Sequence, residues 1–223
     1  MGSRLGNNFI CILWNDLFIG LWKDFIIVIA DKMIIYVPEV VMLAFFFLII
    51  MTPVTSQAYI LVFIFQNLNL PTIAPFAFFF RYLFFACGAL LAPAFTLTLK
   101  QQLLFSAGAF IINFLCGTLI DIHQPTIVAV LMCMGCAVGG FGLGMIWVSS
   151  SRYLHLVCEM KNIVEERGAV LGMFQFITCF AFVGGALLTF LEIGVLDINV
   201  NLYFATLAMF GFAAYFFNSY KIL

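Results

Sequence analysis

The stretch that decides the fold runs from Thr126 to Gly168 and reads TIVAVLMCMGCAVGGFGLGMIWVSSSRYLHLVCEMKNIVEERG. Its first part is apolar over the roughly 20 residues that a membrane-spanning helix requires. Two pairs of glycines four residues apart lie in this part, Gly135 with Gly139 and Gly140 with Gly144. Because this spacing lets two helix backbones approach closely, the stretch predicts a tightly packed central helix. We expect this helix to leave the membrane between residues 147 and 153, before a charged connector.

The composition of the whole chain agrees with a membrane protein. Of its 223 residues, 65% are hydrophobic and only 9% are charged, whereas a soluble domain carries about 25% charged residues. Polar side chains are too few to cover a soluble core of this size, so we predict an all-α, polytopic membrane protein. The net charge of -1 does not favour nucleic acid as a partner.

The residues that most often carry chemistry are scattered. His123 and His155 are far apart, and Cys133 and Cys136 form a C-x-x-C motif inside a predicted span, where small packing residues are the favoured reading. The acidic residues of the predicted outer loops form no spacing with a known mechanism. We therefore expect neither an enzyme nor a metal or other cofactor.

Residues 1–37 are predicted to form a separate unit. Polar residues recur at steps of seven and eight between residues 9 and 36, which keeps them on one narrow face of a helix. Trp14 and Trp22 belong to the apolar remainder. This pattern favours an amphipathic helix in the membrane interface. The alternative is a seventh span, in which five charges would each cost about 2.5–3.5 kcal/mol near the bilayer centre.

Residues 38–223 are predicted to form a bundle of six transmembrane helices. The spans are expected at about 40–65, 73–95, 103–120, 126 onward, 169–191 and 200–218. A polar segment, Thr52 to Gln57, surrounds Pro53 in the first span and indicates either a helix kink or a polar path. Gly168 and Gly172 repeat the four-residue glycine spacing in the fifth span and are further candidates for helix packing.

The charges outside the spans predict the orientation. With the N-terminus inside, all Lys and Arg outside the spans fall on the inner side, and the outer loops 66–72, 121–125 and 192–199 contain none. This distribution obeys the positive-inside rule and predicts both termini on the cytoplasmic or matrix side. The abundance of Phe, Ile and Leu fits an organellar inner membrane, such as the mitochondrial one, which we favour slightly.

Arg81 is the candidate binding residue with the strongest physical argument. It lies about 12 Å along its predicted helix from Ile73, at 1.5 Å per residue, which is near mid-membrane. Its guanidinium cannot lose its proton, and the predicted spans contain no Asp or Glu. We therefore expect Arg81 to face a neighbouring subunit or a bound phospholipid. Further candidates for partner or lipid binding are Lys100, Arg152, Trp14 and Trp22.

An ordered set of short motifs resembles a known family. The motifs are Phe65-Gln66-Asn67-Leu68, Tyr82, Leu91-Ala92-Pro93, Ser106-Ala107-Gly108, Gly142 to Val148, Tyr153-Leu154, Arg167-Gly168 and Gly172-Met173-Phe174. Together they resemble the N-terminal, six-helix half of the uncoordinated-ninety-three-like branch of the major facilitator superfamily. The resemblance covers roughly residues 40–218 and implies half of a facilitator bundle.

The chain departs from that family in three respects. The charged loop that follows the second helix is reduced to residues 96–101, Arg81 stands where the family usually has an apolar residue, and six spans supply only one of the two halves between which facilitators transport. The family includes transporter-like members, channel regulators and trafficking escorts. We expect a non-catalytic accessory subunit that binds other membrane subunits and phospholipids. The alternative is a half-size transporter or channel regulator that works as a homodimer.

Overall fold

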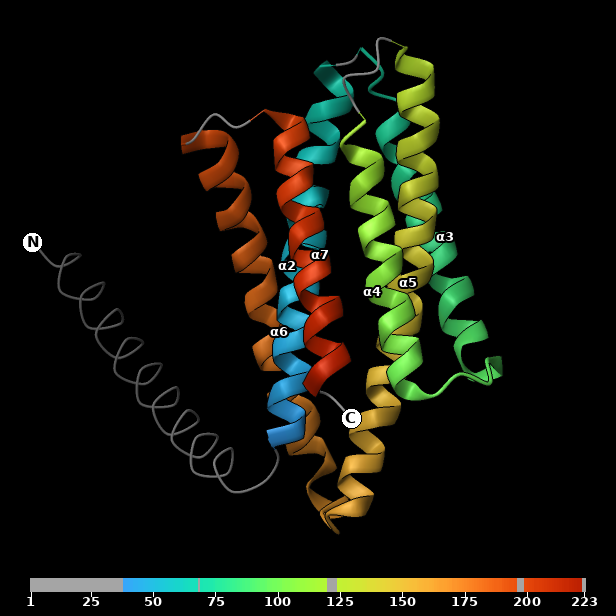
Figure 1. The fold of residues 1–223 in the computed structure, drawn as a ribbon, viewed down its shortest axis with the longest axis vertical. Coiled ribbons are helices and arrows are strands. Elements are labelled where there is room, and N and C mark those ends of the chain that lie inside the picture. Colours follow the sequence, from blue (N-terminus) through green and yellow to red (C-terminus); the bar gives the residue numbers. More distant parts are fainter. Residues whose placement is uncertain (1–37, 68, 120–123, 196–198, 222–223) are drawn as a thin grey trace, which may run out of the picture. The chain divides into compact units, whose positions relative to one another are not determined.

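The computed structural model describes residues 38–67, 69–119, 124–195 and 199–221 (Figure 1). The described part is helical, and the residues from Glu39 onward form one compact unit. The helices are α2 (Pro38–Asn67), α3 (Ile73–Leu91), η1 (Ala92–Ala94), α4 (Leu99–Gly117), α5 (Pro125–Met160), η2 (Val164–Glu166), α6 (Arg167–Thr189), the π-helical η3 (Phe190–Val195) and α7 (Val200–Lys221). The predicted interfacial helix, with Trp14 and Trp22, lies outside the described residues.

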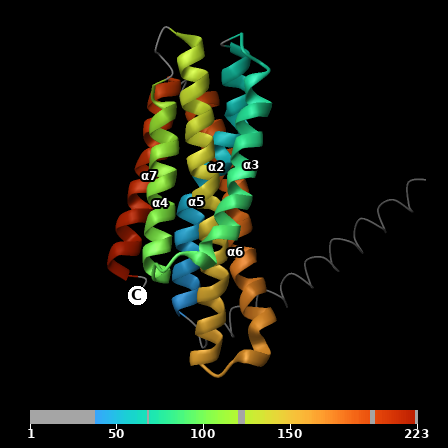
Figure 2. The ribbon, with the colours of Figure 1, turned by 90° about the vertical axis from the view of Figure 1, so that its right-hand side faces the viewer.

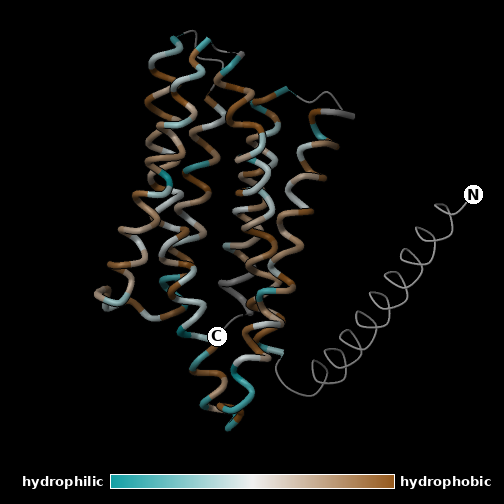
Figure 3. Tube along the Cα trace, turned by 180° about the vertical axis from the view of Figure 1, so that it is seen from behind, coloured by the Kyte–Doolittle hydropathy of each residue, from teal (hydrophilic) through white to brown (hydrophobic). Residues whose placement is uncertain are grey.

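The all-α membrane architecture predicted from the composition is confirmed at this level. Within the described residues, five helices are long and apolar enough to cross a membrane, namely α2, α3 with η1, α4, α5, and α6 with the helical turns that flank it. In α7 the apolar stretch is shorter, from Val200 to Phe216. Figure 3 shows hydrophobic residues along the helices and hydrophilic residues gathered around the connector 161–166.

Two helical segments extend beyond the spans expected from the sequence. Helix α5 continues to Met160, past residues 147–153, where we expected the chain to leave the membrane. Its serines do not break it, because Ser149 and Ser151 donate to the carbonyls four residues earlier, at 2.7 and 3.0 Å. The predicted loop from Glu192 to Asn199 begins instead as the π-helical turn η3.

The start of α4 has a clear local cause. The Thr98 hydroxyl accepts from the Gln101 backbone N–H at 3.3 Å, and the Gln101 side chain accepts from the Thr98 N–H at 2.9 Å. This reciprocal pair is a capping box, which satisfies amides that have no partner inside the helix. It turns the chain after η1, so α3 and α4 run in opposite directions (Figure 1).

The helices pair in a regular pattern. Helix α5 packs against α3 and α4, and α4 also packs against α7. Helix α2 is hydrogen-bonded to α6 through Thr55 and to α7 through Ser56. These five pairings are unchanged when α2, α3 and α4 are exchanged for α5, α6 and α7, respectively. Figure 2 shows α4 beside α7 from the side of the bundle.

Glycines bring α5 into close contact with two neighbours. A Cβ added to Gly140 or Gly144 would meet the backbone carbonyl oxygen of Arg81 or Phe85 in α3. Another face of α5 contacts α4. There a Cβ at Gly135 would lie 2.9 Å from the Cβ of Cys116, and a Cβ at Gly139 would lie 2.9 Å from the Cγ of Asn113. The four glycines predicted to pack α5 therefore lie at its interfaces with α3 and α4.

The packing role expected for Gly168 and Gly172 is not found. Both residues are exposed on α6, and a Cβ at either would meet nothing within 4 Å. The closely packed glycine of this helix is Gly185, where a Cβ would collide with Thr55 and with the backbone N of Ser56 in α2. The spacing of Gly168 and Gly172 therefore did not identify the closely packed turn of α6.

We call the end of the bundle that holds residues 92–98 and 161–166 the charged end. An aromatic cluster and an ion pair link helices toward this end. The rings of Phe47, Trp147 and Phe174 join α2, α5 and α6, with centroids 5.2 Å apart for Phe47 and Trp147 and 4.9 Å for Phe47 and Phe174. Lys161 forms an ion pair with Glu39 at 3.2 Å. Together these contacts link the start of α2 to the connector that follows α5.

Candidate functional site

The candidate site is built around Arg81, and its location differs from the one expected. The side chain is only 4% exposed, and the residue belongs to the buried face of α3. Its Nη2 donates to Oε1 of Gln57 in α2 and lies 3.9 Å from the Cys136 sulfur in α5. The expectation that Arg81 faces a neighbouring subunit or a lipid was therefore wrong. Neutral groups of its own bundle, the Gln57 amide oxygen and the Cys136 sulfur, take the place of the partner or lipid that we expected.

Asn113 of α4 completes the arrangement. Its Nδ2 donates to Oε1 of Gln57 at 2.8 Å, and Nε2 of Gln57 lies 3.4 Å from Oδ1 of Asn113. Both amide side chains are buried, and Gly139 leaves the space that Asn113 occupies. We call Gln57, Arg81, Asn113 and Cys136 the central polar cluster, because it joins one residue from each of α2, α3, α4 and α5.

The central polar cluster holds a positive charge, and neither Arg81 contact described above is to a carboxylate. A guanidinium does not titrate in proteins and donates hydrogen bonds only, so the cluster cannot act as an acid or base through Arg81. The Gln57 amide oxygen accepts from both Arg81 and Asn113, which uses both of its lone pairs. The arrangement is suited to fixing four helices in one register, and its charge is suited to attracting an anion.

A second group of polar side chains joins α2 to α6 and α7. The Ser56 hydroxyl is 2.6 Å from the Tyr203 hydroxyl and 2.7 Å from that of Thr189. The Thr55 hydroxyl donates to the Ala181 carbonyl oxygen at 2.9 Å. In the polar segment around Pro53 the hydroxyls of Thr55 and Ser56 are thus bound to neighbouring helices, and α2 continues through the proline without a break.

Several buried polar residues were not singled out in the sequence, and three of them carry amide or carboxyl side chains. Asn113 is one, and Gln102 is another: it donates to the Ala92 carbonyl at 3.2 Å and accepts from Ser149 at 2.6 Å. These two residues are eleven apart, about three helical turns, so their shared face of α4 was a usable signal. The third is Glu192, which was assigned to an outer loop but is 6% exposed, with Oε2 unpartnered among the described residues.

The other predicted binding residues lie apart from the central polar cluster. Arg152 is exposed on α5 and Lys100 is half-buried in the first turn of α4, both toward the charged end. Of the C-x-x-C pair, Cys136 is buried in the cluster and Cys133 is half-buried. Among the described residues there is no group of three or more His, Cys, Asp or Glu side chains that could hold a metal ion.

Comparison with known proteins adds no relative. No family model, curated protein sequence or solved structure matches this chain. The relationship to the major facilitator superfamily therefore rests on the short motifs quoted above and on the helix pairing, and it enters below as a proposal.

Proposed function

We propose that this protein is a non-catalytic accessory subunit of a larger membrane complex. The observation that carries the proposal is the closure of its polar interior. Gln57, Arg81 and Ser56, which would line a path for a solute, are buried and hydrogen-bonded to one another or to adjacent helices. A transport path needs polar groups that exchange their partners for a solute, whereas hydrogen bonds between buried side chains of adjacent helices hold a scaffold in one arrangement.

The surface of the bundle supports assembly with other membrane proteins through α6. Only 22% of the apolar stretch of α6 is buried within the chain, the same share as in α3, against 56% in α5 and 61% in α2. The exposed side of α6, which takes up most of its circumference, carries large apolar side chains, among them Phe180, Phe182 and Leu187. Aromatic side chains are enriched in the contact regions of protein interfaces. We propose that this side of α6, the α6 face, contacts another subunit.

We further propose the six-span, half-facilitator topology with the N-terminus on the inner side. In major facilitators each six-helix half contains two three-helix repeats of inverted topology. The exchange of α2–α4 for α5–α7, which preserves the helix pairing, supports such a repeat. The absence of Lys and Arg from residues 66–72, 118–125 and 192–199 supports the orientation.

Cysteine accessibility tests this topology. We expect an impermeant maleimide added from outside to label Asn69→Cys, His123→Cys and Asp197→Cys in sealed membranes, but not Lys100→Cys or Lys161→Cys. The inner pair should react only after the membrane is opened, which controls for reactivity. Labelling of Lys100→Cys in sealed membranes would contradict the proposed orientation.

Extraction in a mild detergent, native electrophoresis and mass spectrometry test the assembly. We expect the chain to migrate within a large complex that contains other membrane proteins. The double variant Phe180→Ala/Phe182→Ala should reduce the share of chain in that complex severalfold, because large apolar anchors dominate interface energies. The matched control is Phe105→Ala/Phe212→Ala, which removes exposed rings from α4 and α7. Migration of the native chain as a monomer would refute the proposal.

The unpaired charge of Arg81 favours a second candidate function, transport of an anion by a homodimer. Opening of the central polar cluster would present to a solute a guanidinium whose described contacts are an amide oxygen and a sulfur. This candidate predicts a homodimer on the native gel and anion flux after reconstitution in liposomes. Arg81→Leu should abolish that flux while the dimer persists, and absence of flux from the native chain would reject this candidate.

A further inference from the structure

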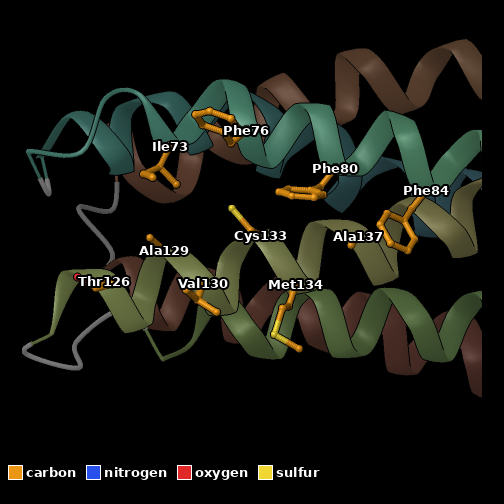
Figure 4. Close-up of a pocket in the computed structure, with 10 residues that line it drawn as sticks. All are labelled: Ile73, Phe76, Phe80, Phe84, Thr126, Ala129, Val130, Cys133, Met134 and Ala137. Carbon is orange, nitrogen blue, oxygen red and sulfur yellow. The ribbon is translucent and has the colours of Figure 1, made fainter.

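A groove between α3 and α5 is the feature that neither the sequence nor the proposed function explains. It has a volume of about 520 Å³ and is lined from α3 by Phe76, Phe80 and Phe84 and from α5 by Cys133, Met134 and Ala137. Figure 4 shows these side chains between the two helices, with Ile73 and Thr126 at one end. We name it the α3/α5 groove.

The cause of the groove is the way in which the two helices pack. They are in closest contact where Gly140 and Gly144 meet the α3 backbone and where Gly88 meets the carbonyl of Phe141. The groove lies beyond this contact, toward the helix ends at Ile73 and Thr126. There the interface is made by large side chains, several of which are exposed, instead of by glycine against backbone.

The position of the groove matches one leaflet of a bilayer. From Ile73 to Phe84 the α3 side extends for about 16 Å at 1.5 Å per residue. The hydrocarbon core of a bilayer is about 30 Å thick, so this length is about half of it. The groove therefore begins near the membrane surface opposite the charged end and stops near the middle of the membrane.

The cross-sectional area of the groove indicates which kind of apolar occupant fits inside it. A volume of about 520 Å³ over about 16 Å gives a mean cross-section of about 30 Å². An α-helix with its side chains is about 10–12 Å across, which corresponds to about 80–110 Å². A whole partner helix is too wide for the groove, whereas a single hydrocarbon chain is narrow enough to lie along it.

The chemistry of the walls sets the polarity of the occupant. The side chains that line the groove are apolar or weakly polar along its length. The one hydroxyl among them, that of Thr126, is at the end near the membrane surface. An occupant must therefore be apolar along the groove and keep any polar group at the Thr126 end. We infer that the α3/α5 groove holds one acyl chain of a phospholipid from the leaflet opposite the charged end.

Photo-crosslinking tests the occupant directly. The full chain is reconstituted in phosphatidylcholine vesicles that contain a phosphatidylcholine with a diazirine on one acyl chain, and adducts are mapped by mass spectrometry. We expect several-fold more adduct at Phe76, Phe80 and Cys133 than at Phe180 and Phe182, which are also exposed but lie on α6. Equal labelling of the groove residues and the α6 residues would mean that the groove contacts lipid no differently from the rest of the surface, and it would overturn the inference.

A pair of matched variants tests the location. Cys133→Trp fills the groove and should lower the adducts at Phe76 and Phe80 several-fold, whereas Cys179→Trp on the exposed side of α6 should not. If Cys133→Trp does not accumulate, Ala137→Leu narrows the same groove with a smaller change. Undiminished adducts in the groove-filling variant, or a protein partner cross-linked at Phe76 and Phe80 in native membranes, would overturn the inference. It does not depend on the accessory-subunit proposal, because the vesicles contain this chain alone.

Discussion

Replacing Gln57 by leucine is expected to lower the free energy of unfolding by about 3 kcal/mol, because it leaves the buried guanidinium of Arg81 without its amide acceptor. Replacing Arg81 by methionine is expected to change that free energy by less than about 1 kcal/mol, since an apolar side chain of similar length suits a bilayer interior. After this change Gln57 still accepts a hydrogen bond from Asn113. The measurement is unfolding in mixed micelles, followed by tryptophan fluorescence.

The double variant provides the decisive comparison. If the loss in Gln57→Leu arises from the stranded charge, Gln57→Leu/Arg81→Met should be more stable than Gln57→Leu alone, with a coupling free energy of about 1–3 kcal/mol. Gln66→Leu is the matched control, because Gln66 is exposed near the end of the same helix. Additive losses in the double variant would contradict the role assigned to Arg81 in the central polar cluster.

Replacing Gly140 or Gly144 by alanine is expected to lower the free energy of unfolding by about 1–3 kcal/mol, as overpacking does in a filled core. The new Cβ would meet a backbone carbonyl oxygen of α3, at Arg81 for Gly140 and at Phe85 for Gly144. A backbone cannot rotate out of the way as a long side chain can, so α3 and α5 must separate. The same unfolding measurement applies, and the leucine variants should be less stable than the alanine variants.

Gly168 and Gly172 supply the controls in the same chain. Both have open space around them on α6, so Gly168→Ala and Gly172→Ala should raise the free energy of unfolding by about 0.5–1 kcal/mol through the higher helix propensity of alanine. Opposite signs at the two pairs of glycines are the expected result. Equal effects at all four positions would show that α3 and α5 are not held in close contact by Gly140 and Gly144.

The residue type alone was enough to single out some residues of the candidate site and of the helix contacts around it. A charged residue in an apolar span is unusual enough to identify Arg81, and the glycine spacing identified the face of α5 that contacts α3. The amide partners of Arg81 were not predicted, because the expectation allowed for acids, carbonyls, lipid headgroups and water but for no side-chain amide. Gln57 and Asn113 are 56 residues apart in the chain, and local spacing does not indicate which amides meet.

The amino-acid sequence by itself determined that this protein is an all-α membrane protein, because apolar runs of span length and a shortage of charges are properties of composition and order alone. Only the tertiary structure decided the direction in which Arg81 points and the existence of the α3/α5 groove. It also decided that Gly140 packs against a neighbouring helix whereas Gly168 has open space around it. The physical reason is that these properties depend on which helices adjoin and at what distance. Every face of these helices is apolar enough to contact either lipid or protein, so hydrophobicity marks the membrane but does not choose the neighbour.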